Sequence, residues 1–338
     1  MLTRPVMAIW FGRGPVSRVL AALLIPFSVL TRWHSMRARA AIARHAPPQL
    51  PVLVVGNLLV GGTGKTPLVV ALARALAASG LGVGLVCSGY GARRQDARLV
   101  RAEDEAGEQG DEAVLLASES GLPVAAGRRR DQALECLLAA YPGLDLVISD
   151  DGLQHQHLAR TVELVVFDRR GLGNGLLLPA GPLREALPAD GQLSAIAVND
   201  APAPRGVRAA HTFGFRIRAL GLAHMGSGET LSPDAFRTRH SGQALCALAG
   251  IGEPTRFFDT LEEQGIHPTH RLALADHARI SASDLAAIPE PLIVMTAKDA
   301  VKCRGFADDR CWILRVEAEP DPQLLIWLQG ALLGNKTA

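Results

Sequence analysis

A glycine-rich loop between an apolar segment and a helical pattern is the feature that most constrains this chain. The loop, Val60-Gly61-Gly62-Thr63-Gly64-Lys65-Thr66, follows the apolar residues 50–55 and precedes an Ala/Leu-rich pattern over 67–79. Glycines let successive backbone N–H groups turn toward one point, where a helix N-terminus adds positive potential. In such a loop the lysine reaches the β- and γ-phosphates, and the threonine hydroxyl binds Mg²⁺. The pattern predicts a P-loop for a nucleoside triphosphate.

The match to the strict P-loop pattern fails at one position. That pattern has a glycine five residues before Gly64, where this chain has Leu59, and the nearest earlier glycine is Gly56. A strand-to-helix turn with a chance Lys-Thr is the alternative, but the strand and helix patterns on both sides argue against it. Switch-type ATPases carry a lysine just before the double glycine. Val60 at that position argues against their class.

Length and composition favour a two-domain α/β protein. The chain has 338 residues, enough for two domains, with 48% hydrophobic and 4% aromatic residues. Its five cysteines are scattered without a CxxC or Cys/His metal spacing. We interpret them as reduced packing residues of a cytosolic protein. No nucleic-acid partner and no obligate protein partner is predicted.

The net charge of +2 conceals an asymmetry along the chain. No acidic residue precedes Asp96, whereas that stretch holds eleven Lys or Arg residues. The rest of the chain, from Asp96 onward, holds the other 24 of the 35 basic residues and all 33 acidic residues, so its net charge is −9. A basic N-terminal end on an otherwise acidic protein indicates an anionic surface or substrate.

The N-terminal segment predicts a helix in an anionic membrane interface. Its apolar run, 19–30, has twelve residues and is interrupted by Pro26. That is shorter than the roughly 20 apolar residues that span a bilayer. Arginines and aromatic residues flank the run, as in interfacial helices: Arg13, Arg18, Arg32, Arg37, Arg39, Arg44, Trp10, Phe11 and Trp33.

Two alternatives remain for this segment. A secretory signal is one, because Ala38-Arg39-Ala40 resembles a cleavage site. The basic spacer over 31–40 and the need of a P-loop for cytosolic nucleotide argue against it. The other is an ordinary amphipathic helix packed on the domain.

Alternating strand and helix patterns predict a doubly wound, mostly parallel sheet. Strands are expected at 81–88, 122–126, 144–149, 163–167 and 195–198, helices at 111–120 and 131–140, and a loop or short hairpin at 93–110. A second α/β pattern has strands at 244–249, 291–295 and 311–316 and helices at 255–264 and 322–333. We therefore divide the chain into an interface segment (1–46), a P-loop domain (47–210), a β-hairpin linker (211–240) and a smaller α/β domain (241–338).

Acidic residues follow several of the predicted strands. Asp150-Asp151 ends a buried strand downstream of the P-loop, as a Walker B element does, and one carboxylate would hold Mg²⁺ beside Thr66. A polar turn is the alternative. Asp168 ends the next strand. Because ligands bind at the carboxyl ends of parallel strands, these acids are expected to face the nucleotide.

Three further groups have both a functional and a structural interpretation. Asp111-Glu112 is expected at a helix start, where acids usually serve as caps; a carboxylate there could also accept a proton from an alcohol. Asp276-His277 suggests a His–Asp partnership. The run 128–130 of three arginines could bind phosphate, but solvated charge is the favoured interpretation.

Several separated motifs cover almost the whole chain in a characteristic order. They are Gly56-Asn57 with 61–67, Gly89-Tyr90-Gly91, Gly110-Asp111-Glu112, Asp150-Asp151-Gly152-Leu153-Gln154-His155, Leu178-Pro179-Ala180-Gly181-Pro182-Leu183-Arg184-Glu185, Gly250-Ile251-Gly252-Glu253-Pro254, Asp276-His277 and Lys298-Asp299-Ala300-Val301-Lys302. In these motifs the chain resembles the tetraacyldisaccharide 4′-kinases, the lipid A 4′-kinases.

The resemblance implies a peripheral or monotopic kinase on the cytoplasmic face of the Gram-negative inner membrane. Such an enzyme transfers the γ-phosphate of ATP, with Mg²⁺, to the 4′-hydroxyl of a tetraacyl glucosamine disaccharide 1-phosphate, giving lipid IVA. It also implies that two α/β domains are joined by a two-stranded linker, with the site between them.

The resemblance also implies roles for individual residues. Asp111 would be the catalytic base, assisted by His277, with Lys65, Asp150 and Asp151 completing the catalytic set. Thr66, Asp150, Asp151 and Gln154 would surround the metal, and Asn57, Arg184 and Glu185 would lie near the substrate. The nucleotide would lie on Val60, Gly61, Gly62, Thr63, Gly64, Lys65, Thr66 and Pro67.

The chain departs from the family pattern at four positions. Cys87-Ser88 replaces Ser-Arg, and alanines stand where the family has Pro, His and Glu, at Ala113, Ala278 and Ala297. None of these removes a proposed catalytic group, but an arginine contact at position 88 is lost.

The alternative function is a membrane-docked P-loop switch ATPase or GTPase. Val60 and the acids at the strand ends favour the kinase, and the lack of an Asn-Lys-x-Asp motif favours ATP over GTP.

Overall fold

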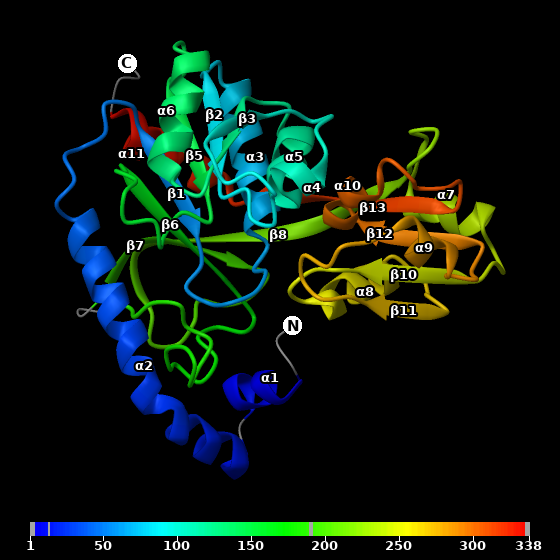
Figure 1. Ribbon diagram of the computed structural model, residues 1–338, viewed down its shortest axis with the longest axis horizontal. Coiled ribbons are helices and arrows are strands. Elements are labelled where there is room, and N and C mark those ends of the chain that lie inside the picture. The colour runs from blue at the N-terminus through cyan, green and yellow to red at the C-terminus, as the bar shows by residue number, and fades with distance from the viewer. Residues whose placement is uncertain (1–3, 13, 189–191, 335–338) are drawn as a thin grey trace.

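The computed structural model describes residues 4–12, 14–188 and 192–334 of the chain. In these ranges one mixed sheet runs through both halves of the molecule, in the order β11-β10-β12-β13-β8-β7-β6-β1-β5-β2-β4-β3, with β9 beside β8. Figure 1 shows the two halves at either end of this sheet, joined in the middle by β8 and β13. The architecture is the predicted α/β fold with a P-loop half and a smaller second half.

The first half has a parallel sheet covered by helices. β1 to β7 are Val52–Gly56, Val83–Cys87, Arg98–Val100, Val124–Ala126, Leu146–Asp150, Val162–Asp168 and Gln192–Asn199, and only β3 is antiparallel to its neighbour. The helices are α3 (Lys65–Ala78), α4 (Ala106–Gln109), α5 (Asp111–Ser120) and α6 (Arg130–Ala140). Every residue of β1 and β5 is buried, as in strands of a sheet covered on both faces.

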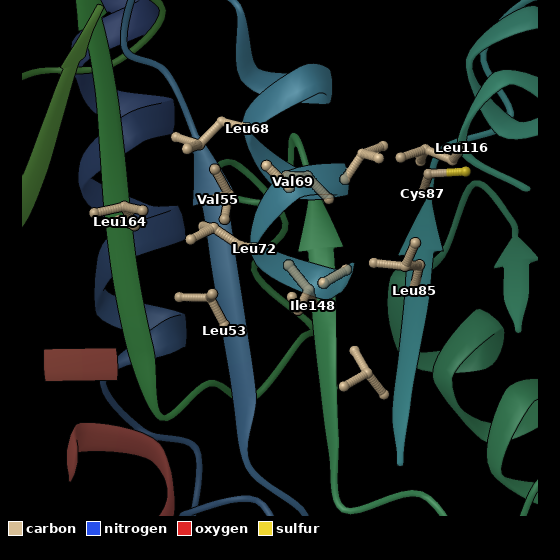
Figure 2. Close-up of a cluster of buried hydrophobic side chains, with 14 of the residues drawn as sticks. Leu53, Val55, Leu68, Val69, Leu72, Leu85, Cys87, Leu116, Ile148 and Leu164 are labelled. Atoms are coloured by element: carbon tan, nitrogen blue, oxygen red, sulfur yellow. The ribbon is translucent and has the colours of Figure 1, made fainter. Parts of the chain in front are cut away.

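The core of the first half lies between this sheet and α3. Figure 2 shows Leu53, Val55, Ile148 and Leu164 of the strands beside Leu68, Val69 and Leu72 of the helix, and all are fully buried. Each such side chain contributes about 1.5–3 kcal/mol by leaving water. This packing fixes the start of α3, and with it the P-loop, over the carboxyl ends of β1 and β5.

The second half repeats the layered pattern on a smaller scale. Its strands are β10 (Leu245–Ala249), β11 (His270–Ala273), β12 (Leu292–Thr296) and β13 (Cys311–Pro320). Its helices are α7 (Pro233–Arg239), α8 (Pro254–Glu263), α9 (Ala282–Ala286) and α10 (Ala297–Cys303). The sequence patterns did not predict β11, α7, α9 or α10. All four are short, and the three helices begin at caps: Ser232, Ser281 and Thr296 each accept a backbone N–H of the first turn.

The halves are joined by two long strands from distant parts of the sequence. β8 (Arg208–His224) is parallel to β7 at its start and antiparallel to β13 over its second part. The expected hairpin within 211–240 exists only as the short pairing of β8 with β9 (Thr230–Leu231). The main partner, β13, lies about ninety residues later, beyond the reach of local sequence patterns.

The last helix returns to the first half. α11 (Pro322–Leu333) falls within the range 241–338 that we assigned to the second domain. Its buried residues Leu324, Leu328 and Leu332 instead belong to the core built around α3. A division of the chain by sequence order alone therefore misplaces this helix.

Two helices precede the first strand. α1 (Arg4–Phe11) is short, and α2 (Pro15–Ile42) runs along the outer edge of the first half in Figure 1. α2 has 28 residues and continues through Pro26, so it is much longer than the apolar run from which it was predicted. By length and composition alone this helix is long and apolar enough to cross a membrane, although its twelve-residue apolar run by itself is too short.

One narrow stripe of α2 faces the protein. Its buried residues are Ala21, Ser28, Ser35 and Ala38, three of them seven apart, while most of its large apolar side chains are exposed. Ser28 and Thr31 donate hydrogen bonds to the carbonyls of Leu177 and Leu178, each at 2.8 Å. The helix is therefore held by polar contacts and leaves its apolar face outside.

Candidate active site

The P-loop has the backbone that its glycines predict. Gly61 and Gly64 have φ of 95° and 90°, which side-chain-bearing residues rarely adopt. A Cβ at Gly64 would also lie 2.6 Å from Asn199 Nδ2, which donates to the Thr63 carbonyl at 3.1 Å. Lys65 then begins α3, so the helix N-terminus points at the loop. The arrangement suits an anion bound by backbone N–H groups.

Asn57 connects the end of β1 to the P-loop lysine. Its amide donates to the Gly61 carbonyl at 2.9 Å, and its Oδ1 accepts from Lys65 Nζ at 3.0 Å. Lys65 Nζ also lies 3.5 Å from Asp151 Oδ1. The ammonium is therefore held over the loop by a fully buried amide and one carboxylate.

Thr66 and Asp150 form a pair that fits a magnesium ion. Thr66 Oγ1 donates to Asp150 Oδ2 at 2.9 Å, while Asp150 Oδ1 is buried and has no hydrogen-bond partner among the residues that the structure describes. Burial raises the pKa of Asp150 to about 6, against the attraction of Lys65. An unpaired carboxylate oxygen beside a threonine hydroxyl offers the hard oxygen ligands that Mg²⁺ prefers.

Asp151 faces away from this pair, toward Arg184. Its backbone is in the left-handed region, with φ of 51°. Its carboxylate accepts two hydrogen bonds from the Arg184 guanidinium, at 2.8 and 3.0 Å. Burial alone would raise its pKa, but Lys65 and Arg184 together hold the pKa of Asp151 well below its usual range. Asp151 is thus an ionised partner of two cations.

Arg184, Gln154 and Glu185 surround Asn57 from the other side. Arg184 Nη2 donates to the Asn57 carbonyl at 2.9 Å and also contacts its Oδ1. Gln154 Nε2 lies 3.3 Å from both the Asn57 carbonyl and Glu185 Oε1. The predicted substrate residues Asn57, Arg184 and Glu185 therefore lie in one cluster beneath the P-loop. Gln154, predicted near the metal, has its amide directed into this cluster.

Asp111 and His277 come together from opposite halves of the molecule. His277 Nδ1 lies 3.0 Å from both carboxylate oxygens of Asp111. Burial would raise the pKa of Asp111 and lower that of His277. The hydrogen bond between them outweighs the effect of burial on both groups, and the charge of Lys298 adds to this effect on Asp111. As a result, the pKa of Asp111 is lowered and the pKa of His277 is raised.

Backbone geometry fixes both members of this pair. Gly110, before Asp111, has φ of 95°, and a Cβ there would lie 2.9 Å from the backbone of Gly89. His277 has φ of 59°, and its ring meets that of Tyr90 edge-on at 4.6 Å. At the variant position 88, Ser88 accepts the Tyr90 backbone N–H, so this residue shapes the turn. A glycine-dependent turn thus positions Asp111, and a left-handed backbone conformation positions His277.

Lys298 is a neighbour of the Asp111–His277 pair that the sequence did not single out. Its Nζ lies 3.1 Å from Glu112 Oε1, 3.0 Å from Asp276 Oδ1 and 3.1 Å from His277 Nε2. Since an ammonium only donates, the neutral form of His277 accepts here at Nε2 and carries its proton on Nδ1, toward Asp111. The signal in the sequence was its place in the motif Lys298-Asp299-Ala300-Val301-Lys302.

Two arginines also contribute where the sequence was ambiguous or silent. Arg130 is fully buried and donates to the Asp150 carbonyl at 3.3 Å, so the solvated interpretation of the arginine run is wrong for this residue. Arg170 donates to the Gly62 carbonyl at 2.8 Å and pairs with Asp168, which ends β6. Both arginines brace the backbone around the P-loop and the acids.

The P-loop and the Asp111–His277 pair are linked through the second half. A Cβ at Gly252 would lie 2.8 Å from the Gly62 nitrogen and 3.4 Å from Asp276 Oδ2. Gly252 thus lies between the P-loop and the residue before His277.

Comparisons with known proteins identify the family. The family model described as Tetraacyldisaccharide-1-P 4′-kinase matches residues 19–333. The curated Tetraacyldisaccharide 4′-kinase of Azotobacter vinelandii is 46% identical over 335 residues, covering 96% of this chain and 95% of its own length. That of Bordetella petrii is 42% identical over 329 residues, covering 93% and 92%.

A solved structure supports the fold. The crystal structure of LpxK from Aquifex aeolicus in complex with ATP superposes with a TM-score of 0.76 at 24% identity, covering 93% of this chain and 99% of the other. The extent of the family match and the full-length relatives show that this chain belongs to the tetraacyldisaccharide 4′-kinase family.

Proposed function

We propose that this chain uses ATP and Mg²⁺, and the residues described above, to carry out its family's reaction at a membrane surface. The family membership gives the activity itself: phosphorylation of the 4′-hydroxyl of a tetraacyl disaccharide 1-phosphate in lipid A biosynthesis. The observation that carries the residue-level proposal is the convergence of Asp111, His277 and the P-loop from both halves.

The P-loop half would bind ATP. Its backbone N–H groups and the N-terminus of α3 suit the β- and γ-phosphates. Lys65 would leave Asn57 and Asp151 to contact the γ-phosphate, and Arg184 would then keep Asp151 paired. The Asp151 side chain is 34% exposed, so water and Arg184 would together stabilise its charge when the lysine moves.

Thr66 and Asp150 would hold the magnesium ion. The hydroxyl and the unpaired oxygen of Asp150 fit it, while Asp151 is turned toward Arg184. When bound, Mg²⁺ neutralises charge on the β- and γ-phosphates. Gln154 remains a further predicted ligand, although its amide contacts Asn57 and Glu185.

Asp111 would take the proton of the 4′-hydroxyl. As that oxygen forms its bond to the γ-phosphorus, the bond from phosphorus to the β–γ bridging oxygen breaks and ADP leaves. The lowered pKa of Asp111 keeps it ionised at neutral pH, and His277 orients it through Nδ1. Because phosphoryl transfer depends mainly on positioning and charge neutralisation, this set of groups is sufficient.

Helix α2 would hold the enzyme at an anionic membrane surface, on the cytoplasmic face where ATP is available. Leu23, Phe27 and Leu30 are among its exposed apolar residues. A cavity of about 340 Å³ between α2 and residues 172–187 has an apolar lining that suits an acyl chain. A membrane-spanning α2 would have to release its contacts to the protein through Ser28 and Arg39. We therefore favour a helix lying in the interface.

Incubation of the protein with γ-labelled ATP and the disaccharide 1-phosphate tests the proposal. We expect a labelled, bisphosphorylated lipid that requires Mg²⁺. ATP hydrolysis without lipid labelling would instead support the switch ATPase or GTPase, which the family membership does not favour.

A further inference from the structure

One charged side chain connects the interface helix to the residues beneath the P-loop. Arg39, near the end of α2, donates to both oxygens of Glu185, at 3.2 and 3.0 Å. Its third contact, from Nη1, is to Glu163 Oε2 at 2.7 Å. One guanidinium thus ties α2 to two separate segments of the first half.

Glu185 depends on this arginine. Its side chain is only 3% exposed, and among the described residues Arg39 is the one cation within ion-pair distance of it. Its other side-chain contact is the amide of Gln154, at 3.3 Å. A buried carboxylate that loses its cation is strongly unfavourable, so segment 184–185 is expected to move when Arg39 is absent.

The contacts continue from Glu185 to the nucleotide site. Gln154 links Glu185 to the Asn57 carbonyl, and Asn57 Oδ1 accepts from Lys65 Nζ at 3.0 Å. Arg184, adjacent to Glu185 in the chain, holds Asp151 and the same Asn57. A continuous path of hydrogen bonds and covalent bonds therefore leads from α2 to the P-loop lysine.

We propose that Arg39 is a positioning residue that couples the seating of helix α2 to the geometry of Lys65 and Asp151. When α2 is seated, Arg39 holds segment 184–185 and thereby Asn57 beneath the lysine. When α2 is displaced, the segment shifts and turnover falls, although no group that contacts the nucleotide is lost. The inference rests on the roles proposed for Lys65 and α2.

The same helix provides a matched control. Arg37 is exposed, two residues away, and its guanidinium stacks over Trp33 at 4.5 Å. It has the charge of Arg39 and lies on the same turn of α2, but it faces solvent and has no contact to Glu185. If arginines near this end of α2 act only by attracting anionic lipid, both substitutions should have the same effect.

The test compares full-length Arg39→Met and Arg37→Met in four measurements: kcat, KM for ATP, affinity for a non-hydrolysable ATP analogue, and flotation with anionic vesicles. For Arg39→Met we expect kcat to fall about 10- to 100-fold, as displacement of a positioned group does, with vesicle binding within about twofold of wild type. Arg37→Met should keep kcat and bind vesicles more weakly. Normal kcat in Arg39→Met, or a loss matched by Arg37→Met, would overturn the proposal.

A double-substitution cycle with Glu185→Gln separates positioning from general destabilisation. If Arg39 acts through Glu185, adding Arg39→Met to Glu185→Gln should lower kcat by less than about twofold more, because the two residues act as one unit. The uncharged pair also removes the buried unpaired carboxylate, so this variant serves if the single substitution does not fold. If the loss of kcat in the double variant equals the product of the losses in the two single variants, Arg39 does not act through Glu185. Labelling of the lipid by the wild-type protein tests the kinase function separately, because its result does not depend on the Arg39 and Glu185 variants.

Discussion

His277 Nδ1 lies 3.0 Å from both carboxylate oxygens of Asp111, although 166 residues separate the two in the chain. Asp111 begins a helix of the P-loop half, and His277 follows β11 in the second half. The pair exists only when the halves are together. The chemistry of the site therefore depends on the interface between the halves as well as on each of them.

This pair makes the stability of the assembled protein depend on pH. The folded pKa of His277 is raised, so its contribution is complete below the unfolded value of about 6.5 and is lost as pH rises through the folded pKa. The folded pKa of Asp111 is lowered, so its contribution is present above the unfolded value of about 3.9 and is lost at lower pH.

We therefore expect His277→Ala to lower the melting temperature most between about pH 4 and pH 6.5, the unfolded values of the two groups. The difference from wild type should shrink toward pH 9, as the pH rises through the raised pKa of folded His277. Thermal melts of both proteins across this range measure it. If the melting temperature of His277→Ala is lowered equally at pH 5.5 and pH 9, the charged Asp111–His277 pair contributes nothing to stability.

Lys65 is expected to contribute mainly to transfer. Lys65→Met should lower kcat by about 10²- to 10³-fold, the usual effect of removing one preorganised donor to developing charge. Arg74→Met is the control, because Arg74 is exposed on the same helix and should be dispensable. Initial rates at saturating ATP measure the difference. Equal rates for the two variants would refute the P-loop assignment.

Asp150 should make metal binding sensitive to pH near neutrality. Burial raises its pKa to about 6, so a proton competes with the cation below that value. We expect the affinity for Mn²⁺, used as a probe with a non-hydrolysable ATP analogue, to fall by up to about tenfold per pH unit below pH 6.

Electron paramagnetic resonance titrations at pH 5.5 and 7.5 measure free Mn²⁺. The pH dependence of Mn²⁺ affinity that remains in Asp150→Asn measures the contribution from titration of the nucleotide itself. If this variant retains the full pH dependence, Asp150 is not the ligand.

The exposed face of α2 should determine membrane binding. Leu23→Glu with Phe27→Glu places two negative charges among side chains that are 66% and 61% exposed, and should abolish flotation with anionic vesicles. Ile326→Glu is the matched control, because Ile326 is 61% exposed on α11. Retained flotation of the α2 variant would exclude α2 as the attachment.

Local sequence patterns were sufficient to predict the P-loop and the acids that follow β5, because neighbouring residues determine both. The strand, glycine loop and helix around Lys65 follow from burial and backbone freedom within about 25 residues. The acids after β5 follow from its continuous apolar run. Such patterns cannot show contacts between distant segments, so Lys298, Arg170 and the burial of Arg130 were missed.

The length of α2 was missed for a related reason. Its second part is basic and polar, and Ser28, Ser35 and Arg39 contact residues in segments 163–186. The pairing of β8 with β13 is likewise long-range. In both regions tertiary contacts, rather than local hydrophobic periodicity, determine where the element ends.

The central claim is that Asp111, oriented by His277 from the other half, takes the proton of the acceptor hydroxyl. Its most direct test is transfer of label from γ-labelled ATP to the disaccharide 1-phosphate by Asp111→Asn, with Asp96→Asn, an exposed aspartate, as control. We predict a loss of about 10²- to 10⁴-fold in kcat for Asp111→Asn alone, with affinity for an ATP analogue within about twofold of wild type. Near-normal labelling of the lipid by Asp111→Asn would contradict the account.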